Sequence, residues 1–319
     1  WDRPGRYIYL KDTESGEYWS LSWAPTLQIP YDRYECRHGS GYTSILTEYK
    51  GIRSRLTYFV PNDLAGEVWQ VECENLSGKD RKLEVYAFTE LLMGNALNDL
   101  INQPNDKHFT DIFFDPEQQA LCATRRYWVL NKGVSVKQPN IAWQYRVLFT
   151  TTLPVKGFDS SLDEFIGKWR SEADPQALVN GKMGNTEITA GDPCAALQSV
   201  LSLKTDEKTG FSVLMMLSDK QGSEDPFTLI GGKKLSDLRD HKLIAREFDD
   251  LKAKWDKIYA SIDIHTPDPE LNVMLNTWNF YQTHVTFDMA RNAGYYHGGL
   301  LFGTGIRDQF QDIFGVLLS

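Results

Sequence analysis

The spacing of apolar residues changes once along this chain of 319 residues, near residue 230. Before that point the dominant period is two, as where Trp19, Leu21 and Trp23 alternate with more polar neighbours. A period of two is typical of strands that bury one face. From residue 234 the period is close to 3.6, the spacing of amphipathic helices. The order predicts a β-rich α+β protein in which a large antiparallel β-sandwich precedes helices.

Short strand candidates follow one another through the first part of the chain. They lie at residues 6–10, 18–23, 52–60, 67–75, 82–91, 109–114, 119–129, 141–151, 195–204 and 210–218. Turn signals such as Glu14-Ser15-Gly16 separate several of them. Residues 34–43 are expected to form a loop whose polar groups could reach a binding site. One helix is expected at 161–170, where Phe165 and Trp169 keep helical spacing.

Three further helices are expected after the change of period. Residues 234–260 carry an apolar stripe with charges on the opposite side. Asp268 is a good cap and Pro269 a good first residue for a helix that runs to about residue 292. A glycine-rich loop at 294–306 then leads into a helix that starts at Arg307. The predicted domains are a sandwich at 1–225, a linker region at 226–266 and a helical domain at 267–319.

Neither end carries the signals that usually open or close a chain. Position 1 is Trp, and an apolar helical face that includes Phe310 and Phe314 reaches the last residues without a cap or glycine. We therefore expect an internal piece of a longer polypeptide.

The composition limits the kinds of partner and cofactor. The net charge is −9, whereas nucleic acids and anionic membranes require a basic surface. No apolar run approaches the roughly 20 residues that span a bilayer. The four cysteines, Cys36, Cys73, Cys122 and Cys194, form no CxxC pair. We expect four buried, reduced thiols and a cytoplasmic protein.

The most specific polar motif stands near the end of the chain, where a glycine loop opens into a helix. Gly303, Thr304 and Gly305 precede Arg307 and Asp308. Arginine offers a fork of donors and a carboxylate is a pure acceptor, so the pair suits the hydroxyls of a sugar. A salt bridge at the start of the helix is the alternative, and the residue types alone favour neither interpretation.

Several segments, in consistent order, resemble one known family. They are Pro4-Gly5-Arg6-Tyr7-Ile8-Tyr9, Glu17-Tyr18-Trp19-Ser20, Cys36-Arg37-His38-Gly39-x-Gly41-Tyr42-Thr43, Thr57-Tyr58-Phe59-Val60-Pro61, Trp278-Asn279-x-Tyr281-Gln282 and Arg307-Asp308-x-x-Gln311-Asp312. Together they resemble the N-terminal part of the cellobiose and cellodextrin phosphorylases of glycoside hydrolase family 94. The resemblance implies a β-sandwich, a helical linker and the truncated start of an (α/α)6 barrel, in a homodimer.

The resemblance also implies a reaction, the reversible and inverting phosphorolysis of a β-gluco-oligosaccharide to α-glucose 1-phosphate. A carboxylic acid protonates the glycosidic oxygen while inorganic phosphate attacks the anomeric carbon from the opposite face. Phosphate is a co-substrate, and no cofactor or metal is implied. The family's general acid and most of its phosphate ligands lie beyond the Arg-Asp motif. No catalytic residue is therefore expected in this chain, and the fragment alone is expected to be inactive.

The same resemblance assigns sugar binding to the end of the chain. The candidate substrate-binding residues are Phe302, Gly303, Thr304, Arg307, Asp308, Gln311 and Asp312. The chain departs from the family pattern at Phe302, where many cellobiose phosphorylases have an arginine. Laminaribiose and β-1,2-oligoglucans therefore remain alternatives to cellobiose and cellodextrins as substrates. Two other classes are alternatives: an inverting (α/α)6 glucan hydrolase, and a non-catalytic carbohydrate-binding sandwich.

Overall fold

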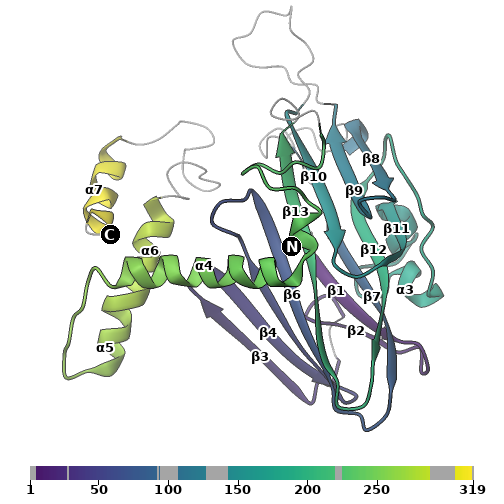
Figure 1. Cartoon of the computed structure of the whole chain (residues 1–319), viewed down its shortest axis with the longest axis horizontal. Helices are drawn as coiled ribbons and strands as arrows, with labels where there is room; N and C mark the ends of the chain where they lie inside the picture. Colours follow the sequence, from purple (N-terminus) through teal and green to yellow (C-terminus); the bar gives the residue numbers. More distant parts are fainter. Residues whose placement is uncertain are drawn as a thin grey trace, which may run out of the picture. The chain divides into compact units, whose positions relative to one another are not determined.

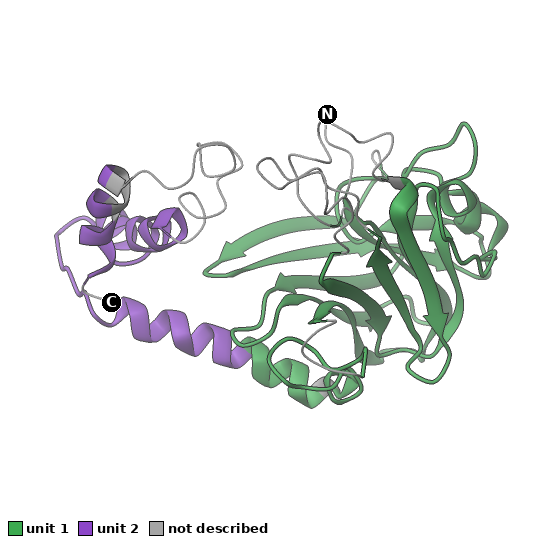
Figure 2. Cartoon of the chain, turned by 90° about the horizontal axis from the view of Figure 1, so that it is seen from above, with its two compact units in different colours: residues 1–248 green, residues 249–319 purple. Residues whose placement is uncertain are grey.

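The structure is a computed structural model that describes residues 5–26, 29–91, 93, 107–126, 143–219, 225–287 and 306–317. The chain forms two compact units, unit 1 at residues 1–248 and unit 2 at residues 249–319 (Figure 2). The strands all belong to unit 1, and the described part of unit 2 contains helices and their connections. None of the described helices has the length and apolar character needed to cross a membrane.

Unit 1 is built on two antiparallel sheets (Figure 1). The five-stranded sheet has the order β11-β12-β7-β1-β2, and the eight-stranded sheet has the order β3-β4-β5-β6-β13-β10-β9-β8. The first sheet contains β1 (Arg6–Asp12), β2 (Tyr18–Ser20), β7 (Arg81–Glu90), β11 (Val155–Ser161) and β12 (Pro193–Leu203). The second contains β3 (Arg33–Gly39), β4 (Tyr42–Tyr49), β5 (Ile52–Phe59), β6 (Gly66–Asn75), β8 (Thr110–Asp115), β9 (Ala120–Arg125), β10 (Tyr145–Thr151) and β13 (Lys208–Asp219).

The main core contains side chains from both sheets. Trp69 of β6 and Phe149 of β10 are buried there, and their ring centroids lie 5.5 Å apart in an edge-on arrangement. Such T-shaped pairs contribute roughly 0.5–1.5 kcal/mol beyond the area they bury. Leu83 of β7 belongs to the same cluster, whereas its neighbours Tyr86 and Phe88 belong to a second one. Strand β7 is therefore buried on both of its faces.

Two short helices close the second cluster. They are α2 (Leu162–Ile166) and α3 (Gln176–Asn180). Phe165 of α2 stacks on Phe88 of β7 with ring centroids 4.6 Å apart. This stack fixes α2 against the five-stranded sheet.

The fold class expected from the sequence, a large antiparallel sandwich followed by helices, is confirmed. The loop expected at 34–43 is wrong: β3 and β4 form a hairpin in which Gly39 pairs with Tyr42. Gly41 has a φ of 79°, which the tight turn requires and glycine supplies at no steric cost. The helix expected at 161–170 is too long, because α2 ends at Ile166 and is followed by Gly167 with a φ of 88°.

The segment after the last strand contains a 3-10 turn, η2 (Asp237–Arg239), and the long helix α4 (His241–Tyr259). Phe248 of α4 contacts the aromatic rings of Tyr42 and Phe59, with centroids 5.1 and 5.0 Å away. The first part of α4 therefore packs on the hairpin and β5 of the eight-stranded sheet.

Unit 2 continues with α5 (Pro269–Val273), the π-helical turn η3 (Met274–Trp278), α6 (Asn279–Val285) and α7 (Ile306–Val316). The predicted cap is confirmed, because Oδ1 of Asp268 accepts from the amides of Glu270 and Leu271 at 3.0 and 3.1 Å. The predicted helix at 269–292 is described to residue 287, and its remainder lies outside the described residues.

All four cysteines are reduced thiols, as expected from their spacing. Cys73, Cys122 and Cys194 are buried, but Cys36 is exposed, so the expectation of four buried thiols is wrong for that residue. Cys36 lies on β3, which among the described strands is at the edge of the eight-stranded sheet, next to β4.

Candidate functional site

Helix α7 carries four of the seven predicted sugar-binding residues. Arg307 and Asp308 lie in its first turn, and Gln311 and Asp312 lie one turn later. The side chains of Arg307 and Gln311 are exposed and share a face of the helix, because residues four apart are neighbours on a helix surface. The side chains of the two aspartates lie outside the described part. The same holds for residues 302–304, so the sugar-binding assignment stays a prediction.

Close packing within unit 2 fixes the position of α7 against α6. A Cβ atom added at Gly315 of α7 would lie 2.2 Å from Cγ2 of Thr283 on α6. Glycine at this position therefore lets the two helices approach closely. The predicted site residues Arg307 and Gln311 lie on the helix that this contact holds.

The other motif of the helical unit, Trp278-Asn279-x-Tyr281-Gln282, contributes to an aromatic cluster. Trp255 lies 4.8 Å from Tyr281 and 5.9 Å from His284, measured between ring centroids. The motif begins at the end of the π-helical turn, which is a rare form that often marks functional segments. Phe280 packs edge-on against His284 at 5.1 Å. His284 therefore packs against the aromatic rings of Trp255 and Phe280.

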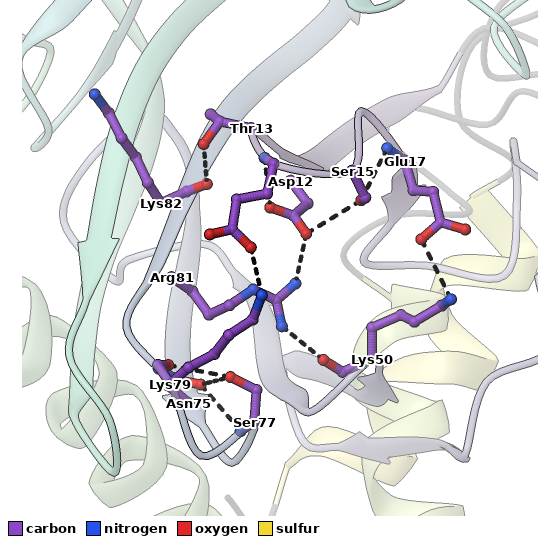
Figure 3. Close-up of polar contacts among 11 residues, drawn as sticks. Asp12, Thr13, Ser15, Glu17, Lys50, Asn75, Ser77, Lys79, Arg81 and Lys82 are labelled. Carbon is purple, nitrogen blue, oxygen red and sulfur yellow. Dashed lines mark hydrogen bonds and ion pairs between the residues drawn. The ribbon is translucent and has the colours of Figure 1, made fainter.

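A polar cluster of unit 1 joins three turns of the sandwich (Figure 3). We call it the turn cluster and define it by three ion pairs: Asp12 with Arg81, Glu17 with Lys50, and Glu14 with Lys79. The acidic partners all come from the β1–β2 turn and its edge. The basic partners come from the β4–β5 turn and from the β6–β7 turn. Asp12 and Arg81 both belong to the five-stranded sheet, Lys79 lies in the turn that joins the two sheets, and Lys50 lies in a turn of the eight-stranded sheet.

Arg81 is the central residue of the turn cluster. It donates from Nη2 to Oδ2 of Asp12 at 3.0 Å and from Nη1 to the carbonyl oxygen of Lys50 at 2.8 Å. Burial alone would raise the pKa of Asp12. The amide of Glu14 and the Arg81 guanidinium outweigh that effect and hold the pKa below its usual value. The fold therefore favours the ionised form of Asp12.

Asn75 stabilises the β6–β7 turn, which is part of the turn cluster. Its Nδ2 donates to the carbonyl oxygens of Lys79 and Lys204 at 2.7 and 2.9 Å, and its Oδ1 accepts from Ser77 Oγ at 2.7 Å. The side chain is completely buried. Asn75-Leu76-Ser77 matches the sequence of an N-glycosylation site. Because the amide nitrogen of Asn75 donates to carbonyl groups inside the fold, the residue has a structural role.

A cavity of about 510 Å³ lies beside the turn cluster and is lined by Lys50, Lys79 and Arg81 among others. Its size would admit a disaccharide. Each of these three cations already has a carboxylate partner within the cluster. Their charges are thus compensated, and the arrangement favours closure of the sandwich end over capture of an anion.

A row of alternating charges crosses the outer face of the eight-stranded sheet. Arg33, Glu48, Arg53, Glu74 and Lys208 are cross-strand neighbours in that order, on five successive strands. Arg53 bridges two of the carboxylates, with distances of 3.0 and 3.1 Å. Opposite charges placed directly across strands are favourable, and charged side chains also protect the edge strand β3. The row is therefore a solvated ladder that stabilises the sheet.

The described residues contain no group of three or more histidine, cysteine or carboxylate side chains that could hold a metal ion. The turn cluster and the row of charges on the eight-stranded sheet are built from ion pairs and hydrogen bonds, which gives them a structural role.

A β-sandwich joined to a helical unit, with a predicted sugar site on that unit, is the arrangement expected of a carbohydrate-active protein. The family model "Glycosyl hydrolase 94, supersandwich domain" matches residues 1–227. The model "Glycosyl hydrolase 94 superfamily, catalytic domain" matches residues 254–319. The chain belongs to glycosyl hydrolase family 94.

Curated relatives match nearly the whole chain. N,N'-diacetylchitobiose phosphorylase of Vibrio furnissii is 30% identical over 318 residues, which are 99% of this chain and 37% of the relative. Solabiose phosphorylase of Paenibacillus borealis is 24% identical over 98% of this chain and 36% of the relative. Cyclic β-(1,2)-glucan synthase of Rhizobium meliloti is 27% identical over 99% of this chain and 10% of the relative. The chain spans little more than a third of the length of the phosphorylases that it matches.

Proposed function

We propose that the chain is part of an inverting phosphorylase that cleaves β-linked disaccharides of glucose or N-acetylglucosamine with inorganic phosphate. The observation that carries this proposal is the match to a phosphorylase over 99% of the chain, across both the supersandwich and the start of the catalytic domain. The products are the α-sugar 1-phosphate and the free acceptor sugar.

The proposed reaction makes one bond and breaks one bond at the anomeric carbon. A phosphate oxygen attacks that carbon while the bond to the glycosidic oxygen breaks, and a carboxylic acid gives its proton to the departing oxygen. Because phosphate replaces water as the nucleophile, a second catalytic carboxylate is not needed. Arg307 and Asp308 hold the sugar that is transferred, and Gln311 and Asp312 extend the same polar surface. The acid and most phosphate ligands belong to residues beyond this chain.

The identity of the sugars is the finer part of the proposal. The family resemblance that favours cellobiose and cellodextrins rests on motifs shared by several subtypes. The relatives include enzymes named for other disaccharides, among them N,N'-diacetylchitobiose and solabiose. Many cellobiose phosphorylases have an arginine at the position of Phe302. Because this chain lacks that arginine, the argument for cellobiose as the substrate is weaker. We therefore place N,N'-diacetylchitobiose beside cellobiose, laminaribiose and the β-1,2-linked disaccharide.

Assembly and location are proposals of the same kind. The resemblance favours a homodimer, which sedimentation of the full-length protein would test. Four reduced thiols favour a reducing, cytoplasmic environment.

The experiment is a phosphorolysis assay of the full-length protein on those four disaccharides. We expect sugar 1-phosphate of the α configuration, detected by phosphorus and proton NMR, and no cleavage when phosphate is left out. Cleavage without phosphate would instead identify a hydrolase. Failure to cleave any sugar, with tight sugar binding retained, would identify a non-catalytic binding protein.

A further inference from the structure

Trp169 is a fully exposed aromatic side chain in the loop between α2 and α3. Its relative exposure is 102%, the highest value among the exposed large apolar residues of the described part of the chain. Its φ of 65° lies in the left-handed region, which bulky residues rarely adopt. Neither burial nor backbone preference accounts for tryptophan at this position. Strained residues of this kind cluster at ligand-binding sites.

The loop that carries Trp169 is fixed at several points. Tyr9, which is completely buried, donates its hydroxyl to the carbonyl oxygen of Glu172 at 2.7 Å. Asp174 accepts from the amide of Ser171 at 3.1 Å and pairs with Arg170 at 3.1 Å. A binding loop that is ordered before its ligand arrives loses little conformational entropy on binding.

The surroundings of the ring determine the kind of ligand. A cavity of about 400 Å³ adjoins it and is lined by residues 162–163 and 166–172. Two basic residues, Lys168 and Arg170, and two acidic residues, Asp163 and Glu172, line this cavity, so it carries no net charge. Such a lining favours a neutral ligand rich in hydroxyl groups over an anion or a cation.

A protein partner is a poorer match to the same surroundings. Interface hot spots are tryptophans set within a larger apolar area that excludes water. The sequence neighbours of Trp169 are Lys168 and Arg170, both charged. A pyranose ring needs only one apolar surface on which to stack, with polar groups at its edge.

We propose that Trp169 and this cavity form a glycan-binding site on the sandwich, separate from the predicted donor site on α7. The indole stacks on the apolar face of one sugar ring, and side chains of Asp163 and Lys168 bond to its hydroxyls. The site would hold an oligosaccharide on unit 1. The choice of β-linked glucose or N-acetylglucosamine oligomers as ligands rests on the proposed function.

The test is the affinity of the full-length protein for cellotetraose and for chitotetraose, measured by calorimetry without phosphate. It is done in the wild type and in Asp308→Ala protein, whose predicted donor site is impaired. Trp169→Ala is expected to raise the Kd of the better ligand about tenfold or more, and Trp169→Tyr by about threefold or less. Trp23→Ala, at another exposed tryptophan, is the matched control and should leave the Kd unchanged. Because the Trp169 side chain is fully exposed, Trp169→Ala and Trp169→Tyr should keep the wild-type Tm.

An unchanged Kd in Trp169→Ala protein for both tetrasaccharides would overturn the proposal. A shift from dimer to monomer on the same substitution would also overturn it, since the ring would then contact a second copy of the chain. The glycan site and the proposed function can fail separately. Binding that depends on Trp169, without formation of sugar 1-phosphate, would support the glycan site and exclude the phosphorylase activity. Phosphorolysis of disaccharides without Trp169-dependent binding would support the phosphorylase activity and exclude the glycan site.

Discussion

Arg81 donates to Oδ2 of Asp12 over 3.0 Å, and the two side chains are only 5% and 9% exposed. The same guanidinium donates to the carbonyl oxygen of Lys50 in the turn between β4 and β5. Asp12 and Arg81 belong to strands of the five-stranded sheet, whereas Lys50 connects two strands of the eight-stranded sheet. One side chain therefore ties the two layers together at this end of the sandwich (Figure 3).

Replacing Arg81 should destabilise the sandwich more than replacing any exposed cation of the turn cluster. Arg81→Met leaves the Asp12 carboxylate buried without its partner, for which we expect a loss of about 3 kcal/mol in the free energy of unfolding. Lys79→Met is the matched control: Lys79 pairs with Glu14, and both side chains are more than half exposed, so its loss should cost less than about 1 kcal/mol. Urea unfolding of both variants measures the difference. Equal losses would mean that Arg81 adds nothing beyond a surface pair.

The stability of unit 1 should depend on acid through Asp12. Its pKa in the folded protein is lowered, so its contribution is fully present above the unfolded value of about 3.9 and is lost as the pH falls through the folded value. Asp12→Asn removes this term. The gap in Tm between the wild type and this variant should therefore be constant near neutral pH and should narrow below about pH 4. A gap that widens in acid would contradict the assigned direction of the shift.

Helix α7 should not tolerate a larger residue at its contact with α6. Gly315→Ala places a Cβ atom 2.2 Å from Cγ2 of Thr283, so the Thr283 side chain or one of the two helices must shift. Overpacking of this kind costs about 1–3 kcal/mol. Thr283→Ala removes the methyl group that is struck and should restore most of the loss in the double variant. Amide hydrogen exchange in α6 and α7 would report the change. Additive effects of the two substitutions would show that the contact is not the cause.

The predictions that were correct depend on residues that lie close together in the sequence. Alternation located most strands of the sandwich, and Asp268 with Pro269 located the start of α5. The hairpin of β3 and β4 was missed because its exposed strand carries charges on one face and glycines at the turn, which resemble a loop. Trp169 was assigned to a helix because its spacing is helical. Only the backbone shows that Gly167 ends α2 before that residue.

Contacts between distant residues account for what the sequence could not predict. Asp12 and Arg81 are 69 positions apart, and no local pattern pairs them. The glycine-rich loop and the apolar helical face after it did predict that a helix starts at Arg307, and α7 begins at Ile306. The role of that pair in sugar binding came from the family resemblance and stays a prediction, because the adjoining loop at 302–305 lies outside the described residues.

Asp308→Ala should lower kcat/KM of the full-length enzyme about a hundredfold or more on its best disaccharide. A desolvated carboxylate that accepts from sugar hydroxyls contributes several kcal/mol to transition-state binding. Arg307→Lys should also lower the rate, since a point charge cannot replace a planar fork of two donors. Phe302→Arg should change the order of preference among the disaccharides more than it changes Tm. Near wild-type rates for Asp308→Ala on every sugar would reduce the pair to a salt bridge at the helix start.

Trp169→Gly should leave the protein as stable as the wild type or more stable by up to about 1 kcal/mol. A non-glycine residue in the left-handed region costs about 1–2 kcal/mol, and glycine removes this cost while adding about 0.5–1 kcal/mol of entropy to the unfolded chain. No packing is lost, because the indole is fully exposed. Lys168→Gly is the matched control one position earlier, where φ is not positive, and it should destabilise by about 0.5–1 kcal/mol. Thermal unfolding of the pair measures the contrast. If Trp169→Gly were the more destabilising of the two, the ring would have to make contacts that its exposure denies. If instead it is stabilising, tryptophan at this position costs stability, which is expected of a residue that serves ligand binding.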